Sequence, residues 1–201
     1  MKSRTILAEL FGTFVLTSAV IISVNNPSFQ IPTPVIAGLT LGLLVYAIGP
    51  ISGCHINPAV TVGLFSIGRI GLQDAGAYLV AQFVGAALAM MLGNVFFLSP
   101  VELVVSGTAL TGFAELFGTV ILGFSVASVV IGRVSANLSG MVIGSGLLVG
   151  ISFAAHQSNG VLNPAVAFGI GSVGHTYFWG PIGGALVGAF LANFFTDPDV
   201  T

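Results

Sequence analysis

The chain has 201 residues, of which 55% are hydrophobic and only 5% are charged, with a formal net charge of −2 at pH 7. A soluble globular domain carries about 25% charged residues, so this composition excludes a surface that faces water throughout. It also gives no reason to expect a nucleic-acid partner. Residues 10–68 and 134–196 contain no Asp, Glu, Lys or Arg, and we therefore predict that lipid surrounds most of the molecule.

The apolar runs are divided by Gly, Pro, Asn and Ser, and their lengths fit membrane-spanning helices of about 20 residues. Six such spans are predicted, at 5–24, 35–52, 76–98, 110–131, 138–156 and 177–195. Two shorter apolar stretches, 58–68 and 164–173, each begin at an Asn-Pro pair. Asn is a favoured N-cap and Pro a favoured first helical residue, so both stretches are predicted to be half-helices that start inside the membrane.

An internal repeat relates the two halves of the chain. Residues 7–13 read Leu-Ala-Glu-Leu-Phe-Gly-Thr, and residues 113–119 read Phe-Ala-Glu-Leu-Phe-Gly-Thr. Residues 57–60 and 163–166 both read Asn-Pro-Ala-Val, at the same offset of 106 residues (115 − 9 and 163 − 57). Each half holds three spans, an odd number, so the second half enters the membrane in the opposite orientation. We predict an all-α membrane protein made of one channel domain, with inverted repeats at about 1–100 and 107–201.

The basic residues predict the orientation of the chain. With the N-terminus in the cytoplasm, Lys2, Arg4, Arg69 and Arg133 all fall on the cytoplasmic side, as the positive-inside rule expects, and Glu102 falls outside. Six spans then place the C-terminus in the cytoplasm as well, and the cell membrane is the expected location.

The segments before the two half-helices, 49–56 and 156–162, are rich in Gly, Pro, Ser, Asn and His. Irregular backbone is tolerated within a bilayer only where it lines a cavity or is buried in protein. If both segments return at the midplane, Asn57 and Asn163 lie where two positive helix N-termini face each other. Their amides then donate hydrogen bonds to a solute, and the opposed dipoles disfavour cations.

These motifs resemble the aquaporin and glycerol-facilitator family, also called major intrinsic proteins, over nearly the whole chain. Residues 51–61, Ile-Ser-Gly-Cys-His-Ile-Asn-Pro-Ala-Val-Thr, are similar to the family's first signature, and the paired Ala-Glu segments are similar to its first and fourth helices. The resemblance implies six helices with two half-helices, and a homotetramer with one pore in each subunit. It further implies that the pore motifs are Asn57, Pro58 and Ala59 with Asn163, Pro164 and Ala165.

Further positions follow from the residues together with this resemblance. Glu9 and Glu115 lie within spans, where they act either as proton-relay carboxylates or as acceptors that support the re-entrant loops, and the resemblance favours support. His55 and His156 are expected to line the pore at its cytoplasmic and outer approaches. Cys54 is placed near the cytoplasmic half of the pore, either accessible to mercurials or buried.

The family's outer filter has four positions, which fall here at Ala37, Ile151, Gly160 and Val166. Water-selective members typically carry an aromatic residue, a histidine, a small residue and an arginine there. Val166 offers neither the donors nor the charge of arginine, so the filter is expected to be wide and apolar. Ala167 stands where glycerol facilitators usually have an acidic residue. Some family members with an aliphatic residue at the arginine position are associated with arsenic resistance, and this chain resembles them at Val166.

The predicted function is a passive channel for water and small uncharged solutes, with glycerol, urea, ammonia and metalloid hydroxides as candidates. The alternatives are an ion- or proton-coupled secondary transporter, since inverted repeats serve those too, and a closed, non-conducting structural member. No nucleophile–base pair or metal-ligand cluster stands out in the sequence, so neither an enzyme nor a cofactor is expected.

Overall fold

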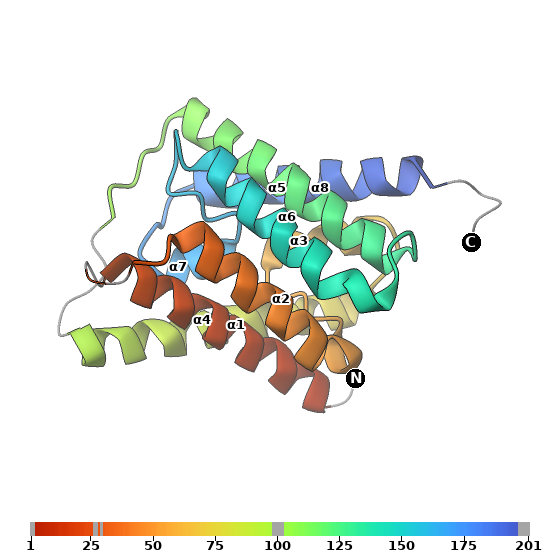
Figure 1. Ribbon diagram of the computed structural model, residues 1–201, viewed down its shortest axis with the longest axis horizontal. Helices are drawn as coiled ribbons and strands as arrows, with labels where there is room; N and C mark the ends of the chain where they lie inside the picture. The colour runs from red at the N-terminus through yellow and green to blue at the C-terminus, as the bar shows by residue number, and fades with distance from the viewer. Residues whose placement is uncertain (1–2, 26–27, 29, 98–102, 197–201) are drawn as a thin grey trace.

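The computed structural model describes residues 3–25, 28, 30–97 and 103–196, and every regular element among them is a helix (Figure 1). The elements are α1 (Ser3–Asn25), α2 (Thr33–Ser52), α3 (Pro58–Ser66), α4 (Leu72–Phe97), α5 (Ala109–Val130), a 3₁₀ helix (Ala136–Leu138), α6 (Ser139–Ala154), α7 (Pro164–Gly169) and α8 (Thr176–Phe194). The predicted all-α fold with long apolar helices is confirmed.

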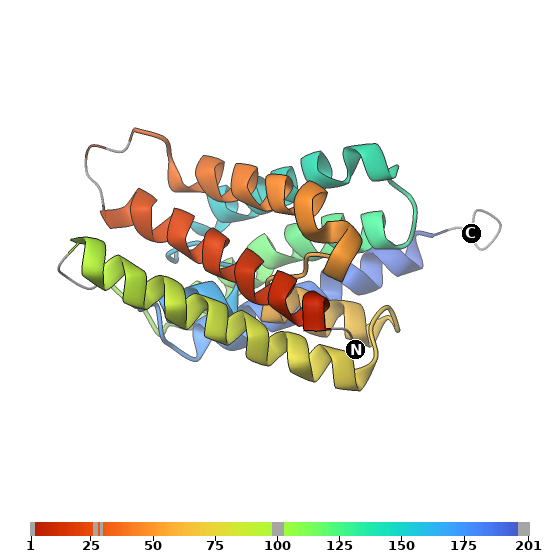
Figure 2. The ribbon, with the colours of Figure 1, turned by 90° about the horizontal axis from the view of Figure 1, so that it is seen from below.

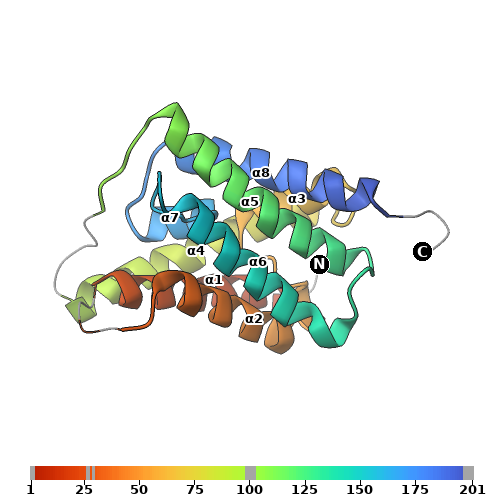
Figure 3. The same cartoon turned by 45° about the horizontal axis from the view of Figure 1, so that its top comes forward.

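Among the described residues, five segments are long and apolar enough to cross a membrane: α1, α2, α4, α5 and the stretch Ala136–Ala154 that contains α6. The sixth predicted span corresponds to α8, which has 19 residues and contains no Asp, Glu, Lys or Arg. It lies alongside α5 in a long helix pair (Figures 1 and 3). The fourth helix begins at Leu72, before the predicted start at 76, and its predicted last residue, 98, lies outside the described residues.

The two short helices are shorter than predicted. α3 ends at Ser66, before the left-handed Gly68, and α7 ends at Gly169, before the left-handed Gly171. Glycine adopts this conformation without the steric cost that a side chain would impose, so it ends a helix readily. α3 and α7 lie toward opposite ends of the molecule (Figure 1). The start of α1 and the end of α8 lie at one end, as the perpendicular view also shows (Figure 2).

Two glycines allow the closest helix packing in the two halves of the bundle. A Cβ atom added at Gly85 of α4 would overlap the carbonyl oxygen of Leu10 on α1. A Cβ atom at Gly184 of α8 would likewise overlap the carbonyl oxygen of Leu116 on α5. Small residues let helix backbones approach where lipid-like apolar surface gives no hydrophobic drive to associate. The α1–α4 pair in the first half of the chain and the α5–α8 pair in the second half are thus closely packed.

The substitution Gly85→Ala should separate α1 from α4 and lower stability by about 1–3 kcal/mol, the usual cost of overpacking. Gly76→Ala is the matched control, because it lies on the same helix and its Cβ would meet nothing within 4 Å. Thermal unfolding of the two purified variants in one detergent measures the difference. Equal midpoints for Gly85→Ala and the parent would contradict the packing role.

Candidate functional site: a central pore

Two irregular loops lead into α3 and α7, and both use left-handed backbone at equivalent positions. Cys54 has φ 52° and Ile56 has φ 39°, while Gly160 has φ 61° and Leu162 has φ 56°. Both pairs are related by the 106-residue offset found in the sequence. Left-handed backbone is uncommon for residues other than glycine, and at bulky residues such as Ile56 and Leu162 it persists only when surrounding contacts hold it.

Those contacts come from the two buried glutamates. Glu9 accepts hydrogen bonds from the backbone N–H groups of His55, at 2.9 Å, and Ile56, at 2.6 Å. Glu115 accepts equivalent bonds from Val161, at 3.0 Å, and Leu162, at 2.7 Å. Both carboxylates are fully buried. Each one satisfies backbone donors that have no water to bond inside a membrane.

Glu9 also accepts two side-chain hydrogen bonds, one from Ser52 Oγ at 2.7 Å and one from Gln82 Nε2 at 2.9 Å. The Gln82 amide donates in addition to Thr61 Oγ1, at 3.0 Å. Glu9 therefore joins α1, the end of α2, the first loop and α4 in one buried network. The sequence analysis identified Glu9 but not Gln82, because no motif marks a glutamine inside an apolar helix.

Asn57 and Asn163 cap the two half-helices. Asn57 Oδ1 accepts from the backbone N–H of Ala59 at 2.8 Å, and Asn163 Oδ1 accepts from Ala165 at 3.0 Å and from Val166 at 3.3 Å. Both asparagines have extended backbone, as an N-cap requires, and the proline that follows each begins the helix. The caps fix the orientation of both amides, with the oxygen toward the helix.

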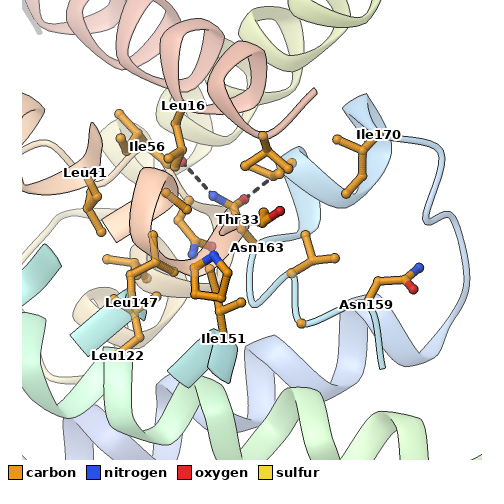
Figure 4. Close-up of a pocket in the computed structure, with 18 of the residues that line it drawn as sticks. Leu16, Thr33, Leu41, Ile56, Leu122, Leu147, Ile151, Asn159, Asn163 and Ile170 are labelled. Atoms are coloured by element: carbon orange, nitrogen blue, oxygen red, sulfur yellow. Dashed lines mark hydrogen bonds between the residues drawn. The ribbon is translucent and has the colours of Figure 1, made fainter. Parts of the chain in front are cut away.

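The amide nitrogens cross between the two loops. Asn57 Nδ2 donates to the carbonyl oxygen of Leu162 at 2.9 Å. Asn163 Nδ2 donates to the carbonyl oxygen of Ile56 at 3.0 Å (Figure 4). Each NH₂ group has two hydrogens, so one hydrogen on each amide remains free for a solute. Both side chains line the same cavity.

That cavity has a volume of about 300 Å³ and lies between the helices and the two loops. Leu16, Leu41, Leu122 and Leu147 contribute to one apolar wall, in the view of Figure 4. The loops supply the polar strip, which includes the two asparagines. On α6 the lining residues are Ile143, Leu147 and Ile151. Their spacing of four keeps them on one face of the helix.

All four predicted filter positions line this cavity: Ala37, Ile151, Gly160 and Val166. Val166 lies in the first turn of α7 and is 3% exposed. A Cβ atom at Gly160 would lie 3.0 Å from the carbonyl oxygen of Ile151, so the second loop passes very close to α6. None of these four residues carries a polar side-chain group, so the cavity wall is apolar at each of these positions.

The two predicted pore-lining histidines are placed differently. His55 lines the cavity, as does the neighbouring Cys54. His156, expected at the outer approach, lines a groove with Phe113, Phe117 and Phe153 and is not among the residues that line the cavity. The preceding Ala155 does face the cavity. Successive residues of a helical turn point about 100° apart, which turns His156 away.

Asn159 lines the cavity but was not identified from the sequence. Its backbone N–H donates to Tyr177 Oη at 3.0 Å, and its Nδ2 donates to Ser172 Oγ at 2.8 Å and to the Val104 carbonyl at 3.3 Å. It thereby ties the second loop to α8, to the α7–α8 turn and to the segment before α5. A lone Asn in a loop gives no sequence signal for contacts this distant.

Within the described residues no group of three or more His, Cys, Asp or Glu is arranged to hold a metal ion.

The substitution Glu9→Gln should destabilise the protein, because an NH₂ group would then face donors that now point at a carboxylate oxygen. We expect a loss of about 1–3 kcal/mol, the usual cost of an unsatisfied buried polar group. Asp74→Asn, in the first turn of α4, is the charge-matched control and should change stability less. Thermal unfolding measures both variants, and a larger loss in Asp74→Asn would contradict the supporting role of Glu9.

Comparison with known proteins agrees with this geometry. Residues 1–195 match the family model described as "Major intrinsic protein". Aquaporin NIP1-1 of Zea mays is 33% identical over 209 residues, covering 94% of this chain and 74% of the relative. Nodulin-26 of Glycine max is 33% identical over 214 residues, covering 96% and 79%.

Among solved structures, the aquaglyceroporin from Plasmodium falciparum matches with a TM-score of 0.74 and 23% identity, covering 96% of this chain and 94% of that one. At this identity the likeness shows the fold alone. The family model and the relatives, both matching almost the entire chain, carry the assignment. The chain belongs to the major intrinsic protein family, whose fold it shares.

Proposed function

We propose that the protein is a passive transmembrane channel for water and small uncharged solutes, and that the solutes pass through the central cavity. The observation that carries the proposal is the pair of crossed asparagines. Asn57 and Asn163 each keep one amide hydrogen free beside a cavity that is otherwise mainly apolar. A solute oxygen can accept these hydrogens, while the apolar wall offers no strong binding that would hold it back.

The selectivity filter is proposed to be formed by Ala37, Ile151, Gly160 and Val166. Without a guanidinium, the filter has no fixed positive charge and no side-chain donors. Without large side chains at Ala37 and Gly160, it leaves room for molecules larger than water. Candidate solutes are therefore glycerol, urea, ammonia and metalloid hydroxides. The relative from Zea mays is named as an aquaporin, and the structural neighbour is described as an aquaglyceroporin.

A coupled transporter would need ionisable groups at the solute path. The carboxylates within the spans, Glu9 and Glu115, are engaged with loop N–H groups and are absent from the residues that line the cavity. This arrangement supports the loop-supporting role for both residues. It also favours a passive channel over an ion- or proton-coupled transporter.

The protein is proposed to lie in the cell membrane, with both its N-terminus and its C-terminus in the cytoplasm. Arg4 lies in the first turn of α1, Arg69 in the α3–α4 connection and Arg133 in the connection after α5. These three segments lie at the same end of the molecule (Figures 1 and 2), as the positive-inside rule requires. Lys2 and Glu102 lie outside the described residues. A homotetramer is proposed from membership of the family.

The substitution Val166→Arg tests the filter. A guanidinium in this cavity should narrow it and favour water over larger solutes, so glycerol- and urea-driven reswelling of proteoliposomes should be lost while shrinkage in sucrose remains faster than in empty vesicles. Light scattering after an osmotic shift measures both rates. Val173→Arg is the matched control, because Val173 is 57% exposed and lies outside the cavity lining.

Two outcomes would contradict this account of the filter. Reswelling that is equally fast in Val166→Arg and Val173→Arg would mean that Val166 does not set solute selectivity. Shrinkage of parent vesicles no faster than that of empty vesicles would contradict an open channel and favour a gated or non-conducting protein.

A further inference from the structure

The imidazole of His55 contacts Thr61 and Tyr78, and it also borders the cavity. Its Nδ1 lies 3.2 Å from Thr61 Oγ1, and its ring packs edge-on against Tyr78, with ring centroids 5.1 Å apart. Tyr78 is itself fixed by a hydrogen bond from its hydroxyl to the carbonyl oxygen of Ser52, at 2.6 Å. Nε2 has no hydrogen-bond partner among the described residues, and the His55 side chain, 8% exposed, lines the cavity.

Thr61 makes three contacts through one hydroxyl oxygen. It lies 3.1 Å from the carbonyl oxygen of Asn57, which can only accept a hydrogen bond. It lies 3.0 Å from Gln82 Nε2, which can only donate. The Gln82 amide has this orientation because the same nitrogen donates to the Glu9 carboxylate, at 2.9 Å. The third contact is His55 Nδ1, whose role depends on where the imidazole carries its proton.

A hydroxyl group has one hydrogen and two acceptor lone pairs. The hydrogen points to Asn57 O, and one lone pair receives the Gln82 hydrogen. The remaining lone pair can accept from His55 only if Nδ1 carries a hydrogen. In the opposite tautomer, Nδ1 and the Asn57 carbonyl would compete for the single hydroxyl hydrogen. The tautomer protonated at Nδ1 is therefore the one in which all three contacts are hydrogen bonds.

We propose that Thr61, oriented by Gln82 and Asn57, holds His55 in the neutral Nδ1–H tautomer, so that Nε2 presents a hydrogen-bond acceptor to the solute. Thr61 is a positioning residue, and His55 is a specificity-determining residue. The inference rests on the proposed channel function and deepens it. A solute that accepts from Asn57 and Asn163 then finds an acceptor of its own hydrogens at His55.

The class of solute follows from the two kinds of group on the cavity wall, the amide donors of Asn57 and Asn163 and the proposed acceptor at His55 Nε2. Molecules that carry both an acceptor oxygen or nitrogen and an O–H or N–H donor meet a partner at both places. Water, urea and neutral hydroxides belong to this class. A small molecule with acceptors but no donor would leave Nε2 without a partner while displacing its water, which costs part of one hydrogen bond.

Nitrogen-15 NMR of histidine-labelled protein in proteoliposomes tests the tautomer directly. The chain has three histidines, His55, His156 and His175, and the latter two are exposed. A variant with His156→Gln and His175→Gln therefore reports His55 alone. At a pH where the ring is neutral, we expect Nδ1 to give a protonated resonance and Nε2 an unprotonated one. A protonated Nε2 as the main species would overturn the proposal.

Variants of Thr61, made in the background that keeps only His55, test its positioning role by the same NMR measurement. Thr61→Ser keeps the hydroxyl and should keep the Nδ1–H tautomer. Thr61→Val removes the acceptor, so the population protonated at Nε2 should grow, and urea permeability per reconstituted protein should fall roughly two- to tenfold, which corresponds to one net hydrogen bond. An unchanged tautomer in Thr61→Val would overturn the role given to Thr61. If Thr61→Val does not fold, the spectra of the parent and of Thr61→Ser still show whether His55 carries its proton on Nδ1, and a proton mainly on Nε2 in the parent overturns the proposal.

The spectrum and the flux separate this inference from the channel itself. An unprotonated Nε2 in vesicles without solute flux would contradict the proposed function and leave the tautomer in place. Rapid flux with a protonated Nε2 would leave the channel in place and contradict the inference.

Discussion

Inside a membrane, the backbone of an irregular loop has no water to bond, so the protein must supply each partner. Glu9 and Glu115 meet this requirement from within apolar helices, each accepting from two consecutive N–H groups of a re-entrant loop. Burying a carboxylate costs free energy, and the hydrogen bonds that it accepts offset part of this cost. The left-handed turns at Ile56 and Leu162 depend on these bonds, and the rest of the pore depends on the turns.

Once the loops are held, the asparagines have little freedom. Each amide oxygen caps the half-helix that follows, and each nitrogen donates to a carbonyl of the opposite loop, so the two loops hold one another in place. The remaining amide hydrogens lie beside a mainly apolar cavity wall that includes Val166. The two amide donors thus come from the ends of the loops, whereas the four residues proposed as the filter come from α2, α6, the second loop and α7.

Local signals in the sequence were sufficient for much of this structure. The Asn-Pro-Ala pairs and the 106-residue offset predicted both half-helices, and counting from them placed Val166 on the cavity. His156 was expected on the pore and lines a separate groove, because the turn after α6 decides which side it faces and the sequence does not show that turn's rotation. Gln82 and Asn159 were not identified, since each acts through partners far away in the sequence, and only packing brings those partners together.

The central claim is that water crosses the membrane through this cavity, and the initial rate of osmotic shrinkage in sucrose tests it most directly. Proteoliposomes with increasing amounts of protein should shrink at rates that rise in proportion to protein density. The rate should also depend less steeply on temperature than in empty vesicles, because a solute in the cavity exchanges hydrogen bonds with fixed groups and does not dissolve in lipid. A shrinkage rate that is independent of protein density would contradict the account.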